Sequence, residues 1–188
     1  MSKAEPAPAW KTAAVRHDVR LTPMSDDLLE PLLSAAVAEA EPGEVMPPVP
    51  GPAGWTAARR DAFREFHRAH FGGGHFGPAG TIMYAVTLGG DVVGGVRLTR
   101  LDAPSDVVET GIWLGRSARG RGIGAAALRA VLDEAVRLGA QLVVARTTPA
   151  NRAAINLLRR CGAIIQVEQG QVRARFWLDE AFSTDLAG

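Results

Sequence analysis

The residues best suited to chemistry lie between Asp106 and Ala126, in the stretch DVVETGIWLGRSARGRGIGAA. Val107 to Leu114 favours a β-strand, Arg116 to Arg121 is cationic, and glycines then lead into a helix-forming segment. A helix N-terminus carries unpaired N–H groups and a partial positive charge, and glycine lets a phosphate approach the backbone. Arg119 and Arg121 add full charges. The stretch therefore predicts an anion site, most plausibly for a pyrophosphate.

Two other phosphate-binding motifs, the Walker loop and the dinucleotide-binding fingerprint, are alternative interpretations of this stretch. The chain contains no GxxxxGK[ST] run, which excludes a Walker loop. Gly120, Gly122 and Ala125 satisfy the GxGxxA dinucleotide pattern, and Arg146, after the helix, would suit NADP rather than NAD. A dinucleotide domain needs several further strand–helix units, however, and too little chain follows.

The spacing Arg119-x-x-Gly122-x-Gly124 fits better. It resembles the [Gln/Arg]-x-x-Gly-x-[Gly/Ala] loop of the GNAT acyl-CoA N-acyltransferases, which cradles the coenzyme A pyrophosphate. The resemblance implies acetyl-CoA as cofactor and N-acetyl transfer as the activity. It assigns the cofactor to the loop, the preceding strand and one later asparagine: Ile112, Trp113, Leu114, Arg119, Gly120, Arg121, Gly122, Ile123, Gly124, Ala125 and Asn151.

That asparagine begins a second matching segment, Asn151-x-x-Ala154-Ile155-x-Leu157 followed by Gly162. It resembles the family's Asn-x-x-Ala-x-x-Leu-(Tyr)-x-x-x-Gly-Phe segment, in which the asparagine contacts the pantetheine or helps position the thiol.

Two positions depart from the family pattern. Leu158 stands where the family often has a tyrosine that reprotonates the departing thiolate, and Ala163 replaces the usual aromatic residue. Tyr84 and Cys161 are expected to pack rather than react. The missing tyrosine leaves open a non-catalytic acyl-CoA-binding sensor.

Glu109 is the candidate catalytic residue, because an amine attacks a thioester only after its ammonium has lost a proton. It shares one strand face with Gly111 and Trp113, so partial desolvation would raise the pKa of its carboxyl. The alternative is a surface acid on an edge strand. The resemblance places oxyanion donors at a bulge near Trp113 and Leu114.

Composition limits the classes of protein that remain. The chain has 188 residues, 47% hydrophobic and 22% charged, which suits one domain over residues 14–188 after a loose tail at 1–13. One cysteine excludes a disulfide framework, and a net charge of +1 argues against nucleic acid. Without an apolar leader, a membrane-length apolar run or metal-ligand spacing, we expect a cytoplasmic monomer or homodimer with no membrane partner and no metal.

The remaining elements follow from hydrophobic periodicity and turn residues. A strand containing His17 and Leu21 precedes a helix that Ser25 caps and Pro31 bends or breaks. The proline-rich segment 41–54 should lack regular structure. Further segments are a helix from 55, a hairpin of strands 81–88 and 92–101, a strand at 107–114, a helix at 125–139, a strand at 141–147, a helix at 149–160 and a hairpin at 163–179.

These elements predict an α/β fold of mixed type. About seven strands and about four helices alternate in the order β-α-α-β-β-β-α-β-α-β-β. GNAT domains have this order, around a mixed sheet that splays between its fourth and fifth strands.

The acceptor amine is the least determined part of the site. In the family it lies against the N-terminal helices and the C-terminal hairpin, here residues 41–55 with Phe76 and Trp177. Glu41, Glu44 and Asp61 would hold a cation, and Trp55 would stack on a sugar or ring.

We therefore expect a small cationic amine, with an aminoglycoside-type antibiotic as the leading example and antibiotic resistance as the role. The substrate-binding residues would be Glu44, Trp55 and Trp177. The alternative is a protein N-terminal acetyltransferase of the ribosomal-protein type.

Overall fold

The computed structural model describes residues 18–71, 74–77, 79–101 and 106–178, and predicted positions such as His17 and the N-terminal tail lie outside them. The strands are β1 (Val19–Pro23), β2 (Thr81–Leu88), β3 (Asp91–Arg100), β4 (Val107–Leu114), β5 (Leu142–Thr147), β6 (Ile164–Glu168) and β7 (Gln171–Trp177). The helices are α1 (Asp26–Glu39), α2 (Pro42–Val45), α3 (Ala57–Arg68), α4 (Ile123–Arg137) and α5 (Arg152–Arg160), with a short 3-10 turn, η1 (Arg116–Ala118).

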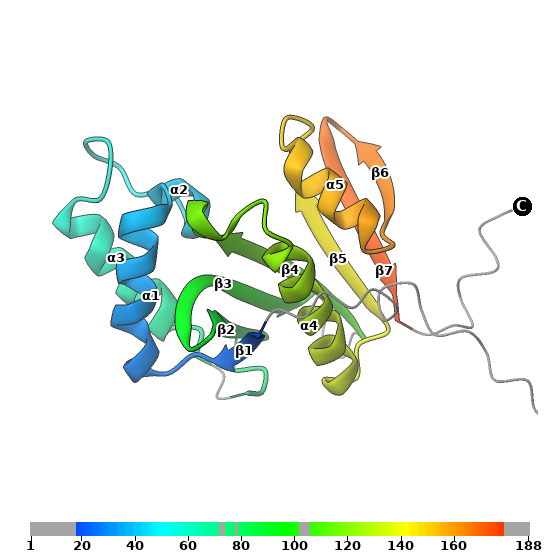
Figure 1. Cartoon of the computed structure of the whole chain (residues 1–188), viewed down its shortest axis with the longest axis horizontal. Helices are drawn as coiled ribbons and strands as arrows, with labels where there is room; N and C mark the ends of the chain where they lie inside the picture. Colours follow the sequence, from blue (N-terminus) through cyan, green and yellow to red (C-terminus); the bar gives the residue numbers. More distant parts are fainter. Residues whose placement is uncertain (1–17, 72–73, 78, 102–105, 179–188) are drawn as a thin grey trace, which may run out of the picture.

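All seven strands form one mixed sheet in the order β1-β2-β3-β4-β5-β7-β6 (Figure 1). Only β4 and β5 run parallel; every other neighbouring pair is antiparallel. The predicted fold class is confirmed, and β2 and β4 have their predicted bounds. At the C-terminal hairpin, Gln169 and Gly170 both have positive φ (50° and 76°), as a two-residue hairpin turn requires.

The two faces of the sheet pack against different helices. Residues alternate along each strand, so Tyr84, Val96 and Val108 point to one face, where α4 contributes Leu128 and Val131 to the larger core. The opposite face carries Met83 and Ala85, which pack under α1 and α3 in a second core. Both cores exclude water from apolar side chains, which is the main favourable contribution to folding.

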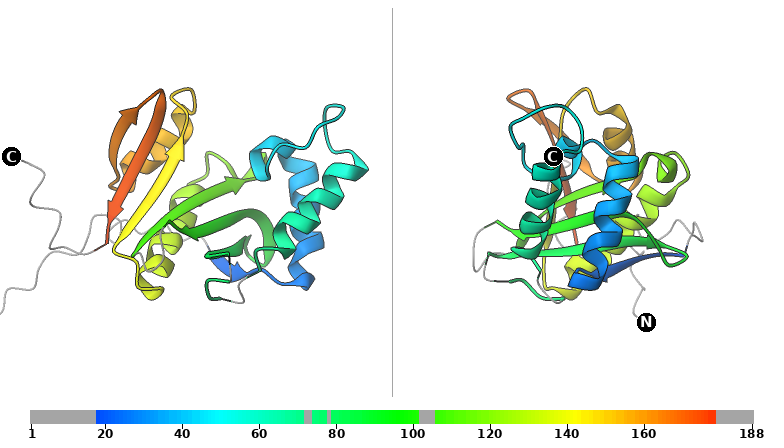
Figure 2. Two further views of the ribbon diagram at one scale, coloured as in Figure 1. Left: turned by 180° about the vertical axis from the view of Figure 1, so that it is seen from behind. Right: turned by 90° about the vertical axis from the view of Figure 1, so that its left-hand side faces the viewer.

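The sheet divides where β4 meets β5. These strands pair over only four positions, from Val107–Leu142 to Thr110–Ala145, whereas β4 pairs with β3 as far as Leu114. Beyond Thr110 the two strands diverge, and the ribbons separate visibly at this point (Figures 1 and 2). The β5-facing edge of β4 is therefore unpaired along Gly111–Leu114.

The proline-rich segment differs from the prediction. Pro42–Val45 forms the single-turn helix α2, in which the Glu44 carboxylate accepts a hydrogen bond from the Glu41 N–H at 2.9 Å. After it, the guanidinium of Arg59 donates to the backbone carbonyls of Val49, Pro52 and Gly54. Prolines lack N–H donors but keep their carbonyls, so one arginine on α3 can hold this loop.

Three further predictions need correction. The helix α1 continues through Pro31 without a break, and Ser25 occupies its N-cap position without a side-chain capping bond. The bulge expected in β4 is absent from its described pairing with β3, which keeps one register from Val108 to Leu114. The irregularity lies between β2 and β3 instead, at Val86 and Thr87.

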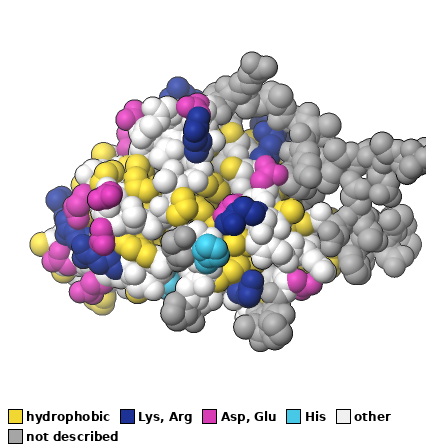
Figure 3. All heavy atoms as spheres, turned by 90° about the horizontal axis from the view of Figure 1, so that it is seen from below, with side chains coloured by type: hydrophobic (Ala, Val, Ile, Leu, Met, Phe, Trp, Pro, Cys, Tyr) yellow, Lys and Arg dark blue, Asp and Glu magenta, His cyan; other side chains and the backbone are white. Residues whose placement is uncertain are grey.

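Charged side chains of both signs intermix at the end of the molecule formed by α1 and α3 (Figure 3). Arg64 bridges Glu30 and Asp61 there, and Arg68 contacts Asp26. Such exposed pairs each contribute little to stability. Within the described residues, no helix combines the length and the apolar character needed to cross a bilayer.

Candidate functional site

The glycine-rich loop between β4 and α4 has the backbone of an anion site. Gly120 and Gly122 have φ of +73° and +81°, values that other residues adopt only with strain. Gly122 is the N-cap of α4 and, having no side chain, leaves the first N–H groups of that helix without a side-chain cap. A ligand with phosphate oxygens suits such donors.

The third glycine has a packing role as well. A Cβ on Gly124 would lie 3.3 Å from Leu157 and 3.6 Å from Leu114, so this glycine lets α4 approach α5 and β4 closely. Of the flanking residues assigned to the cofactor, Ile123 is buried in the core and Ala125 is half-buried. Their contribution to a ligand would come from the backbone.

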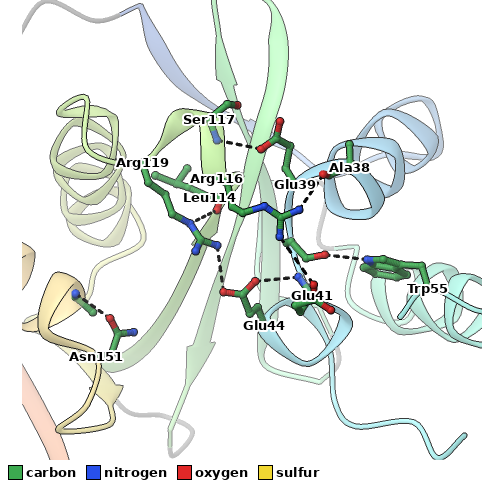
Figure 4. A network of polar contacts seen from close by, with 12 residues as sticks. Ala38, Glu39, Glu41, Glu44, Trp55, Leu114, Arg116, Ser117, Arg119 and Asn151 are labelled. Carbon is green, nitrogen blue, oxygen red and sulfur yellow. Dashed lines mark hydrogen bonds and ion pairs between the residues drawn. The ribbon is translucent and has the colours of Figure 1, made fainter. Parts of the chain in front are cut away.

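The loop arginines are already in contact with the protein. Arg119 donates through Nε to the Leu114 carbonyl at 2.8 Å and through Nη2 to Glu44 at 3.2 Å. Arg121 is exposed and reaches the Ser117 carbonyl at 3.5 Å. Figure 4 shows Arg119 between the loop and α2, which links the predicted phosphate site to the predicted acceptor loop.

The acids of the loop that were expected to hold a cationic acceptor already have cationic partners in the protein. Glu41 lies 3.9 Å from Arg116 and Glu44 lies 3.2 Å from Arg119, while Glu39, which was not predicted, accepts a hydrogen bond from the Ser117 N–H at 2.9 Å (Figure 4). The pKa of Glu44 is lowered, first by the Glu41 N–H and further by Arg119. The Glu44 carboxylate therefore stays ionised while it is bound to Arg119.

The two aromatic residues assigned to the acceptor, Trp55 and Trp177, lie in different parts of the structure. Trp55 donates from Nε1 to the Ala40 carbonyl at 2.9 Å and packs edge-on against Phe63, which places its ring in the second core. Trp177 is half-buried on β7, opposite Leu142, at the end of the sheet away from the splay. The structure brings neither ring to Glu44.

A cavity of about 390 Å³ crosses the sheet at the splay. On the α4 and α5 face its lining includes Thr110, Ile112, Ala145, Asn151 and Leu157; on the α1 and α3 face it includes Met46, Phe66, His67, Arg97 and Trp113. One continuous space therefore reaches from α4 and α5 on one face of the sheet to α1 and α3 on the other. Two reactants could meet there from opposite faces.

Three residues line the cavity on the face of the sheet that α4 and α5 cover. Asn151 caps α5, because its side chain accepts a hydrogen bond from the Ala154 N–H at 3.1 Å. Thr110 is 5% exposed, and its hydroxyl has no hydrogen-bond partner among the described residues. Leu158, at the position where the family often has tyrosine, is buried and lines the same cavity.

Neither Tyr84 nor Cys161 replaces that tyrosine. The Tyr84 hydroxyl donates to Glu134 on α4, and burial raises the pKa of this tyrosine above its usual range. Burial also raises the pKa of the Cys161 thiol, which lies at the end of α5. Both side chains belong to the larger core.

Glu109 lies on the acceptor-side face between two arginines. Its carboxylate contacts Arg146 from β5, as an ion pair rather than an aligned hydrogen bond, and lies 3.7 Å from Arg97 on β3. Its side chain is 15% exposed. The sequence did not associate either arginine with Glu109, because their proximity depends on the sheet register.

His67 is a cavity residue that the sequence analysis missed. It lies on α3, is 3% exposed, and its Nδ1 is 2.8 Å from the Phe63 carbonyl. A carbonyl can only accept, so Nδ1 carries the proton and Nε2 is left as an acceptor. Desolvation lowers the pKa of His67 to about 4, and the ring is neutral at pH 7. Its position on the apolar face of α3 resembled that of an ordinary core residue.

Comparisons with known proteins agree with this geometry. The family model described as "Acetyltransferase (GNAT) family" matches residues 45–163. The GNAT domain of S. lividans PAT has a similar structure, with 24% identity, coverage of 93% of this chain and 99% of that one, and a TM-score of 0.66.

Two other solved structures share the fold at lower identity. Spermidine N-acetyltransferase from Vibrio cholerae has 13% identity, covers 89% of this chain and 98% of its own, and has a TM-score of 0.65. RimL, a ribosomal L7/L12 α-N-protein acetyltransferase in complex with coenzyme A, has 14% identity, coverage of 87% and 95%, and a TM-score of 0.66. No curated protein sequence is similar enough to count as a match. The family model covers more than half of the residues, so this chain belongs to the GNAT acetyltransferase family and is an N-acetyltransferase.

Proposed function

We propose that this enzyme transfers an acetyl group from acetyl-CoA to the primary amine of a small molecule, by direct attack in a ternary complex. The cavity that crosses the sheet at the splay carries the proposal, because its lining includes residues from both faces. Its volume of about 390 Å³ is within the range of small-molecule sites.

The residues around the splay fit coenzyme A. Gly120 and Gly122, with Arg119 and Arg121, would hold the pyrophosphate, since the loop offers helix N–H groups and two guanidiniums. The unpaired edge of β4 from Ile112 to Leu114 offers backbone groups to an extended pantetheine, and Asn151 lies at the same cavity. Bound acetyl-CoA supplies an activated thioester.

Side-chain and backbone groups of the protein would then stabilise the charges that form during acetyl transfer. Glu109 attracts the acceptor's ammonium and takes a proton from it, directly or through water. Unpaired N–H groups of β4 near Trp113 and Leu114 stabilise the oxyanion. The Thr110 hydroxyl, which is at the last paired position before the splay and has no partner among the described residues, would donate a hydrogen bond to the departing sulfur.

Two classes of acceptor remain to be distinguished, a small polycation and a peptide N-terminus. A polycation such as spermidine or an aminoglycoside-type antibiotic has the support of the spermidine N-acetyltransferase likeness, and a peptide N-terminus has that of RimL. The two TM-scores are nearly equal, so the fold favours neither. The acids that a polycation would need, Glu41 and Glu44, are engaged with Arg116 and Arg119.

A thiol-release screen tests the proposal. The full-length protein and acetyl-CoA are incubated with aminoglycosides, polyamines, amino acids and ribosomal N-terminal peptides, and acetylated products are identified by mass. Turnover on a small amine supports the proposal. Turnover confined to peptides would replace it with the protein N-terminal class, and coenzyme binding without turnover on any amine would favour a non-catalytic sensor.

A further inference from the structure

The acceptor-side face of the sheet has an open position at Gly111, in the middle of β4. A Cβ added there would meet no atom within 4 Å, and Gly111 lines the cavity. In the register of the sheet, Arg97 on β3 stands directly opposite Gly111. Arg146 on β5 follows Ala145, the last residue of β5 that pairs with β4, and lines the same cavity from the other side of the splay.

These two arginines flank the open position with positive charge. Both line the cavity, and their side chains are 41% and 47% exposed. They share a single carboxylate, that of Glu109, one pleat away on the same face. Each guanidinium has five N–H donors, so most of their hydrogen-bonding capacity is available to a ligand.

The excess of positive charge continues across the sheet. Arg173 lies opposite Arg146 on β7, and with Arg175 it shares one carboxylate, Glu168. Among the described residues of β3, β4, β5, β7 and β6, this face therefore carries four arginines for two carboxylates. A polycationic acceptor would bring like charge against Arg97 and Arg146, which is unfavourable.

We propose that the acceptor carries a carboxylate as well as its amine, and that Arg97 and Arg146 bind this carboxylate over Gly111. This inference rests on the proposed acetyl transfer and names the class of its substrate. A planar carboxylate suits a pair of guanidiniums, which already hold that of Glu109 between them.

The test compares three amines with the same five-carbon chain: 5-aminopentanoate, 1-aminopentane and 1,5-diaminopentane. They differ at the far end only, which is anionic, neutral or cationic. We expect kcat/KM for 5-aminopentanoate to exceed that for 1,5-diaminopentane by about tenfold or more. A hydrogen bond between a carboxylate and a guanidinium strengthens binding by about this factor, and the diamine has no carboxylate to form one. A preference for the diamine would overturn the inference.

Two variants locate the selectivity. Arg97→Gln and Arg146→Gln should each raise KM for 5-aminopentanoate about tenfold with little change for 1-aminopentane. Arg175→Gln removes the same charge from the same face at a position that does not line the cavity, and should keep the selectivity of the wild type. Equal effects of all three variants would contradict a local carboxylate site.

Calorimetric binding of the same amines, without acetyl-CoA, separates this inference from the proposed activity. Binding of 5-aminopentanoate that depends on Arg146, without acetyl transfer, would support the carboxylate site and overturn the transferase proposal. Acetylation of amines with no preference for the carboxylate would do the reverse. Failure to bind any of the three overturns the inference.

Discussion

The indole of Trp113 occupies the space above Gly95, its cross-strand neighbour on β3. A Cβ on residue 95 would lie 2.6 Å from the indole Nε1, and a Cβ on Gly94 would lie 2.2 Å from the Trp113 carbonyl oxygen. Two adjacent glycines in the middle of a strand normally weaken it. Here they let β4 bring a large ring and its backbone against β3, beside the cavity.

Substitution of these glycines should therefore destabilise the protein. Gly95→Ala forces the ring of Trp113 to move, and Gly94→Ala meets backbone that cannot move cheaply, so we expect losses of about 1–3 kcal/mol with Gly94→Ala the larger. Urea unfolding measures both. Gly111→Ala is the control for stability, because a methyl group there meets nothing within 4 Å. Equal stability of all three variants would contradict this packing.

The left-handed backbone at Gly122 leads to a prediction about coenzyme binding. Gly122→Ala should reduce or abolish the rise in Tm that saturating acetyl-CoA gives the wild type, because the Cβ strains the loop and obstructs phosphate approach.

Gly139→Ala provides the matched control for backbone strain. Gly139 follows the other end of α4, has φ of +78°, and has no atom within 4 Å of an added Cβ. Both variants should lose about 1 kcal/mol of stability, but only Gly122→Ala should lose the response to acetyl-CoA. A wild-type protein that responds to NADP and not to acetyl-CoA would restore the dinucleotide interpretation.

Glu109 can be tested against a second carboxylate in a similar setting. Glu109→Gln should lower kcat about 10²-fold and leave the Kd for acetyl-CoA nearly unchanged, because the amide cannot accept the ammonium proton. Glu168→Gln also removes a carboxylate shared by two arginines, but on the edge strand β6 rather than on β4 beside the splay, and should retain kcat. An unchanged pH–rate profile in Glu109→Gln would leave water as the base.

The Thr110 hydroxyl should have opposite effects on stability and turnover. Thr110→Val removes a buried hydroxyl without a partner in the described structure, so the free energy of unfolding should rise by about 1 kcal/mol. If the hydroxyl bonds the departing sulfur, kcat should fall about tenfold in the same variant, and Thr110→Ser should recover it. A valine variant with the kcat of the wild type would exclude this role.

The buried ring of His67 predicts how stability depends on pH. Its ordinary pKa of 6.5 applies to the unfolded chain, whereas burial lowers the pKa in the folded protein to about 4. Between these values the unfolded chain binds the proton and the folded protein does not. The contribution of His67 is therefore complete above pH 6.5 and is lost as pH falls towards 4, by up to about 3 kcal/mol.

Urea unfolding between pH 7.5 and 4.5 measures this dependence, and His67→Gln should flatten it. His70→Gln is the matched control, since His70 lies three residues further on, is half-buried, and has Nδ1 2.6 Å from the Phe66 carbonyl. It should change the slope less than His67→Gln does, because repulsion from His70 is only the smallest of the causes that lower the pKa of His67. An identical slope in His67→Gln would assign the pH dependence to other groups.

Local pattern was sufficient to predict most elements of this fold. The bounds of β2 and β4 and the turn at Gln169 and Gly170 depend on neighbouring residues alone, and the structure confirms them. The helix α2 was missed because four prolines and two glycines within about ten residues argue against any regular structure, although Pro42 at a first helical position is well tolerated.

The contacts of the site depend on long-range placement, which a single sequence does not contain. Glu44 and Arg119 are 75 positions apart, and they meet only because α2 packs beside the loop before α4. Glu109 and its two arginines come from three strands whose register fixes their distance. The glycines and Asn151 could be recognised from spacing, but the arginine partners of Glu41 and Glu44, the acids predicted to hold a cation, could not.

The start of α4 has no side-chain cap, so the stability of the enzyme would depend on how much coenzyme A is available to bind there. Pyrophosphate oxygens bound at Gly122 would accept hydrogen bonds from the first N–H groups of α4, as the side chain of a serine or aspartate N-cap does in other helices. The ligand would therefore cap the helix. Without them, the first turn of α4 would fray and present the arginine-rich loop to proteases. The abundance of this protein in a cell would then rise and fall with the supply of coenzyme A.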